Sequence, residues 1–183
     1  MENFNNPGYL DIGVGVTWLP IKDLTVTLHP LNYRIVFSDT DGIFEPSLGL
    51  KYVVDYTRSL NVLNGVSWSS KLSGFFSYED NNQSDWTWIN GFGFQAWKGI
   101  GISAEFGLRG SNSEFLSNII NAATSATDGN GDLLYNQTDL DAINFETLEA
   151  TANDINSRSS NPLDIPTSSP VQSYWLIGLS YTL

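Results

Sequence analysis

The chain of 183 residues contains no cysteine and one histidine, His29. The lack of cysteine excludes disulfides, cysteine-ligated zinc, iron-sulfur clusters and thiol nucleophiles, and a single histidine leaves little room for a histidine-rich metal site or a Ser-His-Asp triad. Basic residues are also scarce, because 8 Lys and Arg stand against 20 Asp and Glu, which gives a formal charge of -12. This acidic balance argues against nucleic acid as a partner.

Long apolar runs are missing as well. A membrane-spanning helix needs about 20 mainly apolar residues in a row, whereas the longest stretch without charge, Ile165 to Leu183, carries two prolines and six Ser or Thr residues. A helical membrane protein is therefore excluded. Residues Met1 to Gly8 have neither the basic start nor the apolar middle of a secretory signal. Two interpretations follow: the chain is cytoplasmic, or its true beginning is missing.

The residues that are abundant point to a different class of protein. Aromatic residues make up 13% of the chain and there are 16 glycines, while charged residues fall to 15%, well below the roughly 25% of an ordinary soluble domain. The length suits a single domain. Few charges with many aromatics and glycines are a first indication of a membrane β-barrel.

Apolar residues recur at every second position, which is typical of β-strands with one apolar face. The five even positions from Leu10 to Trp18 are apolar, for example, whereas the odd positions are Asp, Gly, Gly and Thr. In the second strand the phase slips at His29 and Pro30, which predicts a β-bulge. The seven predicted strands are 10–18, 24–38, 48–56, 67–78, 86–96, 100–109 and 175–183.

Alternation alone is compatible with a soluble sandwich and with a membrane barrel. The aromatic residues favour the barrel, because those of the apolar face lie near strand ends with aliphatic residues and Phe between them, as in the interfacial girdles of membrane barrels. The predicted membrane-interface aromatics are Trp18, Tyr56, Trp68, Tyr78, Trp86, Trp88, Trp175 and Tyr181.

Connector lengths agree with an up-and-down barrel, in which short periplasmic turns alternate with longer external loops. Short turns are predicted at Pro20 to Asp23 and Lys98 to Gly99, and a moderately short one at Leu60 to Gly65. The longer, acidic connectors then lie outside when the C-terminus is periplasmic. Single-chain bacterial barrels have an even number of strands, so seven strands predict at least one more upstream. The alternative is an open seven-stranded sheet with a genuine start at Met1.

The polar face of the predicted strands carries charges of both signs beside Gly, Ser and Thr. Such a face either lines an aqueous path or forms a paired network that fills a narrow barrel, and the presence of both signs on successive strands favours the paired network. The predicted lumen-lining charges are Arg34, Lys51, Asp55, Lys71, Glu105 and Arg109.

The stretch from Leu48 to Arg109 resembles an uncharacterised family of Bacteroidota outer-membrane proteins. The resemblance rests on Ser-Lys-Leu at 70–72, Phe-x-x-Tyr at 75–78, a short Asn-rich loop and a Trp-containing strand; His29-Pro30-Leu31 is similar to the family's turn into a strand. It implies an outer-membrane β-barrel of unassigned activity, with no catalytic residue to carry over. The C-terminal strand resembles the signal read by the barrel-assembly machinery, with Gly178, Tyr181 and Leu183, although Leu176 and the terminal Leu depart from it.

Residues 110–170 change composition to Asn, Ser, Thr, Asp and Ala, with 9 acidic residues against Arg158 alone. We interpret this insert as an external loop of the single barrel domain 1–183. Capping-box patterns at Ser111 with Glu114 and at Thr138 with Asp141 predict helices at 113–126 and 139–155; disorder is the alternative. Prolines at 162 and 166 read as a linker back to the sheet.

The segment 128–139, DGNGDLLYNQTD, places oxygen side chains at the spacing of an EF-hand calcium loop. Leu133 replaces the glycine of position 6, and the last position is Asp where Glu is usual. A plain solvated turn is the alternative. The predicted calcium ligands are Asp128, Asn130, Asp132, Asn136 and Asp139.

Taken together, these patterns predict an all-β, antiparallel up-and-down transmembrane β-barrel in a bacterial outer membrane, with a passive transport or structural surface role. We predict no enzyme, because a general base role for His29 has no serine motif beside it. The expected partners are outer-membrane lipid, the barrel-assembly machinery and other outer-membrane proteins. The alternative is a secreted β-sandwich that binds carbohydrate through Trp86 and Trp88.

Overall fold

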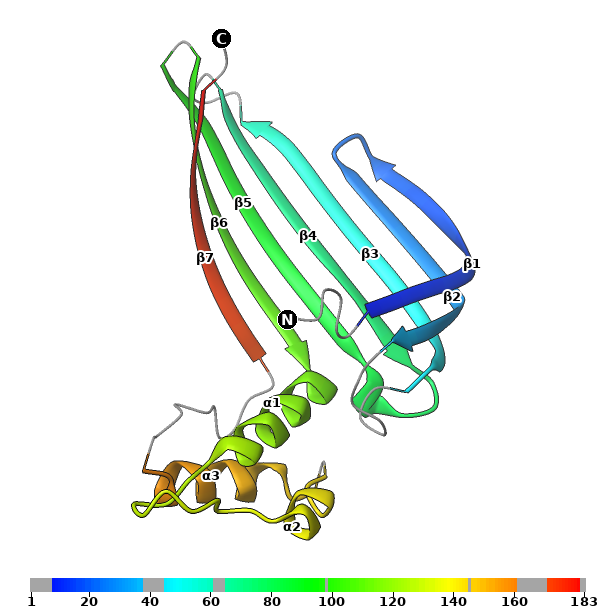
Figure 1. Ribbon diagram of the computed structural model, residues 1–183. Coiled ribbons are helices and arrows are strands. Elements are labelled where there is room, and N and C mark those ends of the chain that lie inside the picture. The colour runs from blue at the N-terminus through cyan, green and yellow to red at the C-terminus, as the bar shows by residue number, and fades with distance from the viewer. Residues whose placement is uncertain are drawn as a thin grey trace.

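The computed structural model describes residues 8–37, 45–60, 65–97, 99–144, 146–160 and 171–181. Seven long strands form one antiparallel sheet in which each strand pairs with its neighbours in sequence (Figure 1). The strands are β1 (Gly8–Ile21), β2 (Leu24–Phe37), β3 (Ser47–Leu60), β4 (Val66–Ser77), β5 (Asp85–Trp97), β6 (Ile100–Ser111) and β7 (Val171–Tyr181). The all-β class, the up-and-down order and the seven predicted strands are confirmed.

The predicted bulge in β2 is also confirmed. The pairing of β2 with β3 shifts between His29 and Asn32, and opposite this point the pairing of β1 with β2 shifts between Val14 and Val16. The shift leaves Pro30 outside the paired register, which removes the need for the backbone N–H that proline lacks. Beyond the bulge the alternation resumes with Arg34 on the polar face.

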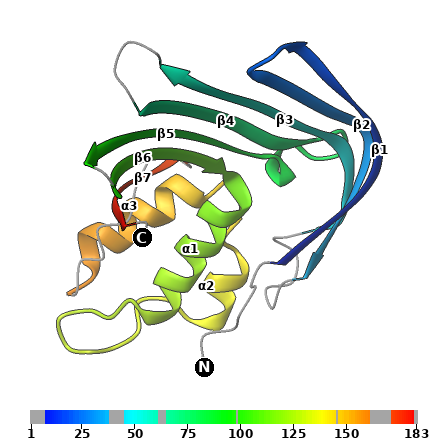
Figure 2. The same ribbon diagram turned by 90° about the horizontal axis from the view of Figure 1, so that it is seen from above.

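The sheet is strongly curved but is not closed, and β1 and β7 are its two edges in the described part of the chain. Seen from above, it forms an arc (Figure 2), and the helices lie beyond one end of the strands (Figure 1). The turn at Lys22–Asp23 and the turn before Ile100 lie at one end of the sheet, and the chain leaves the other end through β6 into the helices (Figure 1).

The convex face of the sheet is apolar and exposed. Val14 is 70% exposed in β1, and Trp175 and Ile177 are 77% and 82% exposed in β7. A soluble sheet normally buries its apolar face against a second layer, and the described strands form only this one sheet. Other large exposed apolar residues of the same face are Leu10, Ile12, Val16, Trp18, Leu31, Phe76, Phe92, Phe94 and Leu179.

Most of the buried apolar residues lie in a helical unit inserted between β6 and β7. It contains α1 (Asn112–Ser125), α2 (Gln137–Asp141) and α3 (Leu148–Arg158), and a 3-10 helix η1 (Asn81–Gln83) precedes β5. Among the described residues no helix is both long enough and apolar enough to cross a membrane. The buried core of the helical unit is Phe115, Leu116, Ile119, Ala123, Ala126, Ile143, Ala152 and Ile155.

The first predicted helix is confirmed within one residue at each end, and Ser111 caps it by accepting a hydrogen bond from the backbone N–H of Glu114. The second, predicted over 139–155, is wrong, because the chain forms two separate helices there. Asn144 interrupts the helical pattern: its side-chain oxygen accepts hydrogen bonds from the backbone N–H groups of Glu146 and Thr147. Such local bonds compete with helical ones.

The predicted capping box at Thr138 and Asp141 is wrong as well. The box is formed by Asn136 and Asp139 at the start of α2. Asn and Asp both serve at these positions, so the pattern admitted two registers two residues apart.

Candidate functional site

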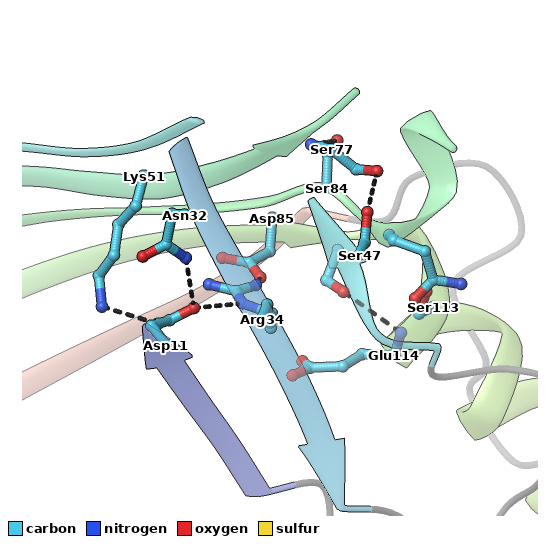
Figure 3. A network of polar contacts seen from close by, with 12 residues as sticks. Asp11, Asn32, Arg34, Ser47, Lys51, Ser77, Ser84, Asp85, Ser113 and Glu114 are labelled. Atoms are coloured by element: carbon cyan, nitrogen blue, oxygen red, sulfur yellow. Dashed lines mark hydrogen bonds and ion pairs between the residues drawn. The ribbon is translucent and has the colours of Figure 1, made fainter. Parts of the chain in front are cut away.

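The concave face carries a network of charged and polar side chains near the helical end of the sheet (Figure 3). It draws residues from β1, β2, β3, β5, β6 and α1, and its centre is Arg34, which is only 7% exposed. Three basic and three acidic side chains take part in its ion pairs, so the network is neutral. These six are Asp11, Arg34, Lys51, Asp85, Arg109 and Glu114.

Asp11 binds three donors from two strands. Its Oδ1 accepts hydrogen bonds from Asn32 Nδ2 and Arg34 Nε, both at 3.0 Å, and its Oδ2 accepts one from Lys51 Nζ at 2.7 Å. Asn32 is 2% exposed, so its amide depends on this carboxylate for a partner. Asp11 therefore fixes β1 to the inner faces of β2 and β3.

Arg34 reaches much further. Its Nε binds Asp11 on β1, and its Nη1 forms an ion pair with Asp85 Oδ2 on β5. Two strands, β3 and β4, lie between Arg34 and Asp85 in the sheet. Neighbouring strands are about 4.8 Å apart, so a flat sheet would hold these side chains well out of reach. The contact therefore depends on the curvature of the sheet at this end.

Two aromatic rings pack against the guanidinium group of Arg34. The Cζ atom of Arg34 lies 4.1 Å from the ring centroid of Phe75, which is 1% exposed, and 4.9 Å from that of Tyr9. Gly49 makes room for Phe75, because a Cβ at Gly49 would lie 2.6 Å from that ring and 2.3 Å from the Phe76 carbonyl oxygen. Cation–π contact and hydrogen bonding thus act on the same buried group.

Hydroxyl groups extend the network to the connecting segments. Ser47 and Ser77 are buried and share a hydrogen bond between their hydroxyls. The Ser77 Oγ also accepts hydrogen bonds from the backbone N–H groups of Glu79 and Asp80, and the Ser77 backbone N–H donates to Ser84 Oγ at 3.0 Å. These bonds fix the chain between β4 and β5 against the start of β3.

Glu114, in the first turn of α1, joins the helical unit to the network through an ion pair with Arg109 of β6. Burial raises the pKa of the Glu114 carboxyl above its ordinary value; the positive charge of Arg109 lowers it and the negative charge of Asp85 raises it. Ser113 adds a neutral tie, since its Oγ donates to the Asn82 carbonyl at 2.8 Å. The start of α1 is thereby fixed to β6 and to η1.

The raised pKa of Glu114 predicts a pH dependence of stability. A folded-state pKa above the unfolded value means that the proton favours the folded form, so the contribution is fully present below the ordinary value of 4.5 and is lost as pH rises through the folded pKa. We expect the free energy of unfolding of the wild-type protein, relative to that of Glu114→Gln, to be larger at pH 4.5 than at pH 7. Denaturant unfolding followed by circular dichroism at both pH values measures this.

Arg109→Gln provides a matched comparison, because it removes the positive charge that opposes the shift. We therefore compare the stability of Arg109→Gln with that of the Arg109→Gln/Glu114→Gln double variant. Their difference should decrease more steeply between pH 4.5 and pH 7 than the difference between the wild type and Glu114→Gln. A wild-type protein and a Glu114→Gln variant with the same pH dependence would contradict the assignment.

The predicted lumen-lining charges all lie on the polar face, but only three join the network. Arg34, Lys51 and Arg109 do so, and their acidic partners are Asp11, Asp85 and Glu114, three residues that are not among the predicted lumen-lining charges. Alternation placed Asp11 on the polar face and is the signal that could have found it; Asp85 and Glu114 were assigned to a connector and to the insert.

The other three predicted charges lie outside the network. Glu105 Oε1 accepts a hydrogen bond from Tyr174 at 2.9 Å. Asp55 and Lys71 are direct cross-strand partners in the sheet, yet within the described residues neither is in an ion pair shorter than 4 Å. The concave face is therefore packed with ion pairs toward the helical end and lined by Ser, Gly and separate charges toward the turns.

The predicted interface aromatics lie mainly on the convex face. Trp18 is exposed; Trp68 is partly covered, with its ring centroid 5.2 Å from that of Tyr56 and 6.3 Å from that of Phe92. Trp175 packs at 4.5 Å against Phe106. Tyr78 follows β4 and donates a hydrogen bond to the Pro30 carbonyl oxygen at 2.8 Å. Trp86 and Trp88 lie at the start of β5, and the side chain of Tyr181 is outside the described residues.

The predicted calcium ligands divide into two groups. Asp128 Oδ1 accepts hydrogen bonds from the backbone N–H groups of Asn130 and Asp132, which lowers the pKa of the Asp128 carboxyl. Asn136 and Asp139 instead form the capping box of α2. No group of three or more acidic or histidine side chains that could hold a metal ion is found in the described residues, and the calcium loop stays a prediction.

The network is held by mutual charge neutralisation, so its chemistry is that of a fixed cross-link between strands. His29 lies apart from it at the bulge, where its ring is close to Gly15. Comparison of the chain with protein-family models, with curated proteins and with solved structures finds no match.

Proposed function

We propose that this chain forms the wall of an outer-membrane β-barrel with a structural or surface role, its lumen closed toward the helical end by the charged network. The observation that carries this proposal is the exposed apolar convex face of a curved sheet whose concave face is polar. In water an apolar face of this size is unfavourable, since exposed patches on soluble monomers rarely exceed a few hundred Å². In a bilayer the same face is stabilising.

A secreted sandwich accounts for these observations less well. It would bury the apolar face between two sheets, whereas the described strands form one sheet with its polar face inward. Residues such as Val14 and Ile177 would then face water at 70% and 82% exposure. The distribution of apolar residues thus supports the membrane reading.

The ion pairs favour a closed lumen over an open channel. A water-filled pore needs hydrated charges along its wall, but Arg34 is nearly buried and is bound by carboxylates from both sides. Breaking these pairs to let solute pass would leave buried charges without partners, at a cost of several kcal/mol. A wall cross-linked from β1 to β5 suits anchoring of the helical unit at the membrane surface.

Insertion in a bilayer also requires that the backbone groups at the two edges of the sheet are hydrogen-bonded. Every backbone polar group within the hydrocarbon layer must be hydrogen-bonded, and β1 and β7 are edge strands among the described residues. The proposal therefore requires that both edges pair with further strand segments to close the barrel.

Tryptophan quenching by brominated lipids tests the proposal. The complete polypeptide is folded into phosphatidylcholine vesicles whose acyl chains carry bromine, which quenches only indoles in contact with lipid. We expect strong quenching that decreases in Trp175→Phe, because Trp175 is 77% exposed on the convex face. Quenching by aqueous iodide and not by brominated chains would contradict membrane insertion.

The same vesicles, fused to a planar bilayer, test the closed lumen. We expect no stepwise conductance from the wild-type protein. Discrete steps would show an open pore and would replace the structural role by passive transport, with membrane insertion retained.

A further inference from the structure

A hollow of about 320 Å³ lies at the helical end of the sheet, between β3, β4, β5 and β6 and the segments η1 and α1. Its volume is at the lower end of the range for small-molecule sites. It adjoins the charged network, because its lining includes Phe75, whose ring lies against the Arg34 guanidinium, but no charged side chain is among its lining residues. Those used below are Tyr52, Phe76, Asn81, Ser84, Trp86 and Asn112.

Aromatic rings from the convex face form one part of this hollow. Tyr52, Gly74, Trp86 and Gly110 are direct neighbours across β3 to β6. The two aromatic rings lie over the glycines: a Cβ on Gly74 would be 2.5 Å from the Tyr52 hydroxyl oxygen, and one on Gly110 would be 2.4 Å from Trp86 Nε1. Because glycine has no side chain, the rings of Tyr52 and Trp86 lie close to the backbone of the neighbouring strand.

Neutral polar groups form the other part. Ser84 Oγ accepts a hydrogen bond from the Ser77 backbone N–H, which leaves its own proton to donate. Asn112 Nδ2 donates to Asn82 Oδ1, so the Asn112 oxygen remains an acceptor. Asn81 is an exposed residue of the lining. Amides and hydroxyls of this kind pair with the hydroxyl groups of a sugar, which both donate and accept.

The surrounding charge disfavours an anionic ligand. Glu79 and Asp80 precede η1, and the basic residues next to the lining in sequence, Lys51 and Arg109, are held in ion pairs on the concave face. A phosphate would therefore lack a cation and would meet two carboxylates nearby. A pyranose ring fits the lining instead, because its C–H faces pack on aromatic rings and its hydroxyls reach the amides.

We propose that this hollow binds the neutral sugar headgroup of a membrane glycolipid. The inference rests on the proposed membrane insertion, since the hollow adjoins the exposed apolar face that would contact acyl chains. The lipid then lies with its chains along the convex face and its sugar over Trp86, at the level where apolar strands give way to polar connecting segments.

Native mass spectrometry of the complete polypeptide, folded in amine-oxide micelles that contain no sugar, tests the proposal with monogalactosyl diacylglycerol as the probe. We expect one bound lipid per chain. Apparent affinity should fall about tenfold in Trp86→Ala and about threefold to tenfold in Asn81→Ala, an exposed position whose loss leaves folding intact. Trp175→Ala, an exposed aromatic outside the hollow, should bind as the wild type does.

Two further probes separate the sources of binding. Phosphatidylglycerol with the same acyl chains should bind without dependence on Trp86, and equal dependence would overturn the proposal in favour of general lipid contact. Methyl β-galactoside alone should bind at least tenfold more weakly; equal binding would overturn the glycolipid assignment and leave a soluble-sugar site. Absence of galactolipid binding by protein that still inserts in vesicles would overturn this inference alone, whereas failure to insert would overturn both proposals.

Discussion

Arg34→Ala should reduce the free energy of unfolding by about 3–5 kcal/mol, the usual cost of removing one partner from a buried ion pair. The Arg34 side chain is 9% exposed and binds two carboxylates, that of Asp11 on the neighbouring strand β1 and that of Asp85 on β5, three strands away. Asp11 keeps Lys51 and Asn32 as partners, but Asp85 loses its ion-pair partner. The denaturant midpoint of protein folded into vesicles measures the effect.

Three variants identify the cause of this loss. Arg34→Lys should recover little, because one ammonium group does not reproduce the Nε and Nη1 contacts to opposite sides. Arg34→Met with Asp85→Asn should recover more, since no unpaired charge remains buried. Arg58→Ala, on an exposed side chain of β3, should leave the denaturant midpoint close to that of the wild type. A wild-type midpoint in Arg34→Ala would show that the network does not hold the strands.

The strands could be predicted from the sequence because each has one apolar face and a period of two residues. The slip at His29 and Pro30 was readable for the same reason, since it reverses the parity of every later residue in β2. Knowledge of the bulge places Arg34 on the polar face together with Lys51. Local pattern therefore determined both the strands and the face on which each charge lies.

The partners within the network could not be predicted from this pattern. The odd or even position of a residue in a strand predicts the face on which its side chain lies, but not the residues that it contacts. Arg34 contacts Asp85 only because the sheet curves across two intervening strands. Glu114 belongs to a helix, whose period gives no information about a strand surface. The break at Asn144 was missed because a capping side chain outweighed helix propensity over one turn.

Val14→Arg should destabilise the folded, inserted protein by about 2–4 kcal/mol, the cost of arginine on the lipid face of a barrel near the bilayer midplane. Val14 lies in the middle of β1 and is 70% exposed. In water the same substitution at such a position usually changes stability by no more than about 0.5 kcal/mol. The size of the effect therefore reports which solvent covers the convex face.

A matched control uses the concave face. Ser69 is exposed there, on β4, so Ser69→Arg should change stability by less than about 1 kcal/mol, because the added charge remains in the polar interior. Ile177→Arg, 82% exposed on the convex face of β7, should repeat the loss seen with Val14→Arg at a second edge. Both effects are measured as denaturant midpoints in phosphatidylcholine vesicles. Equal, small changes in all three variants would mean that water covers both faces, and the membrane proposal would then be wrong.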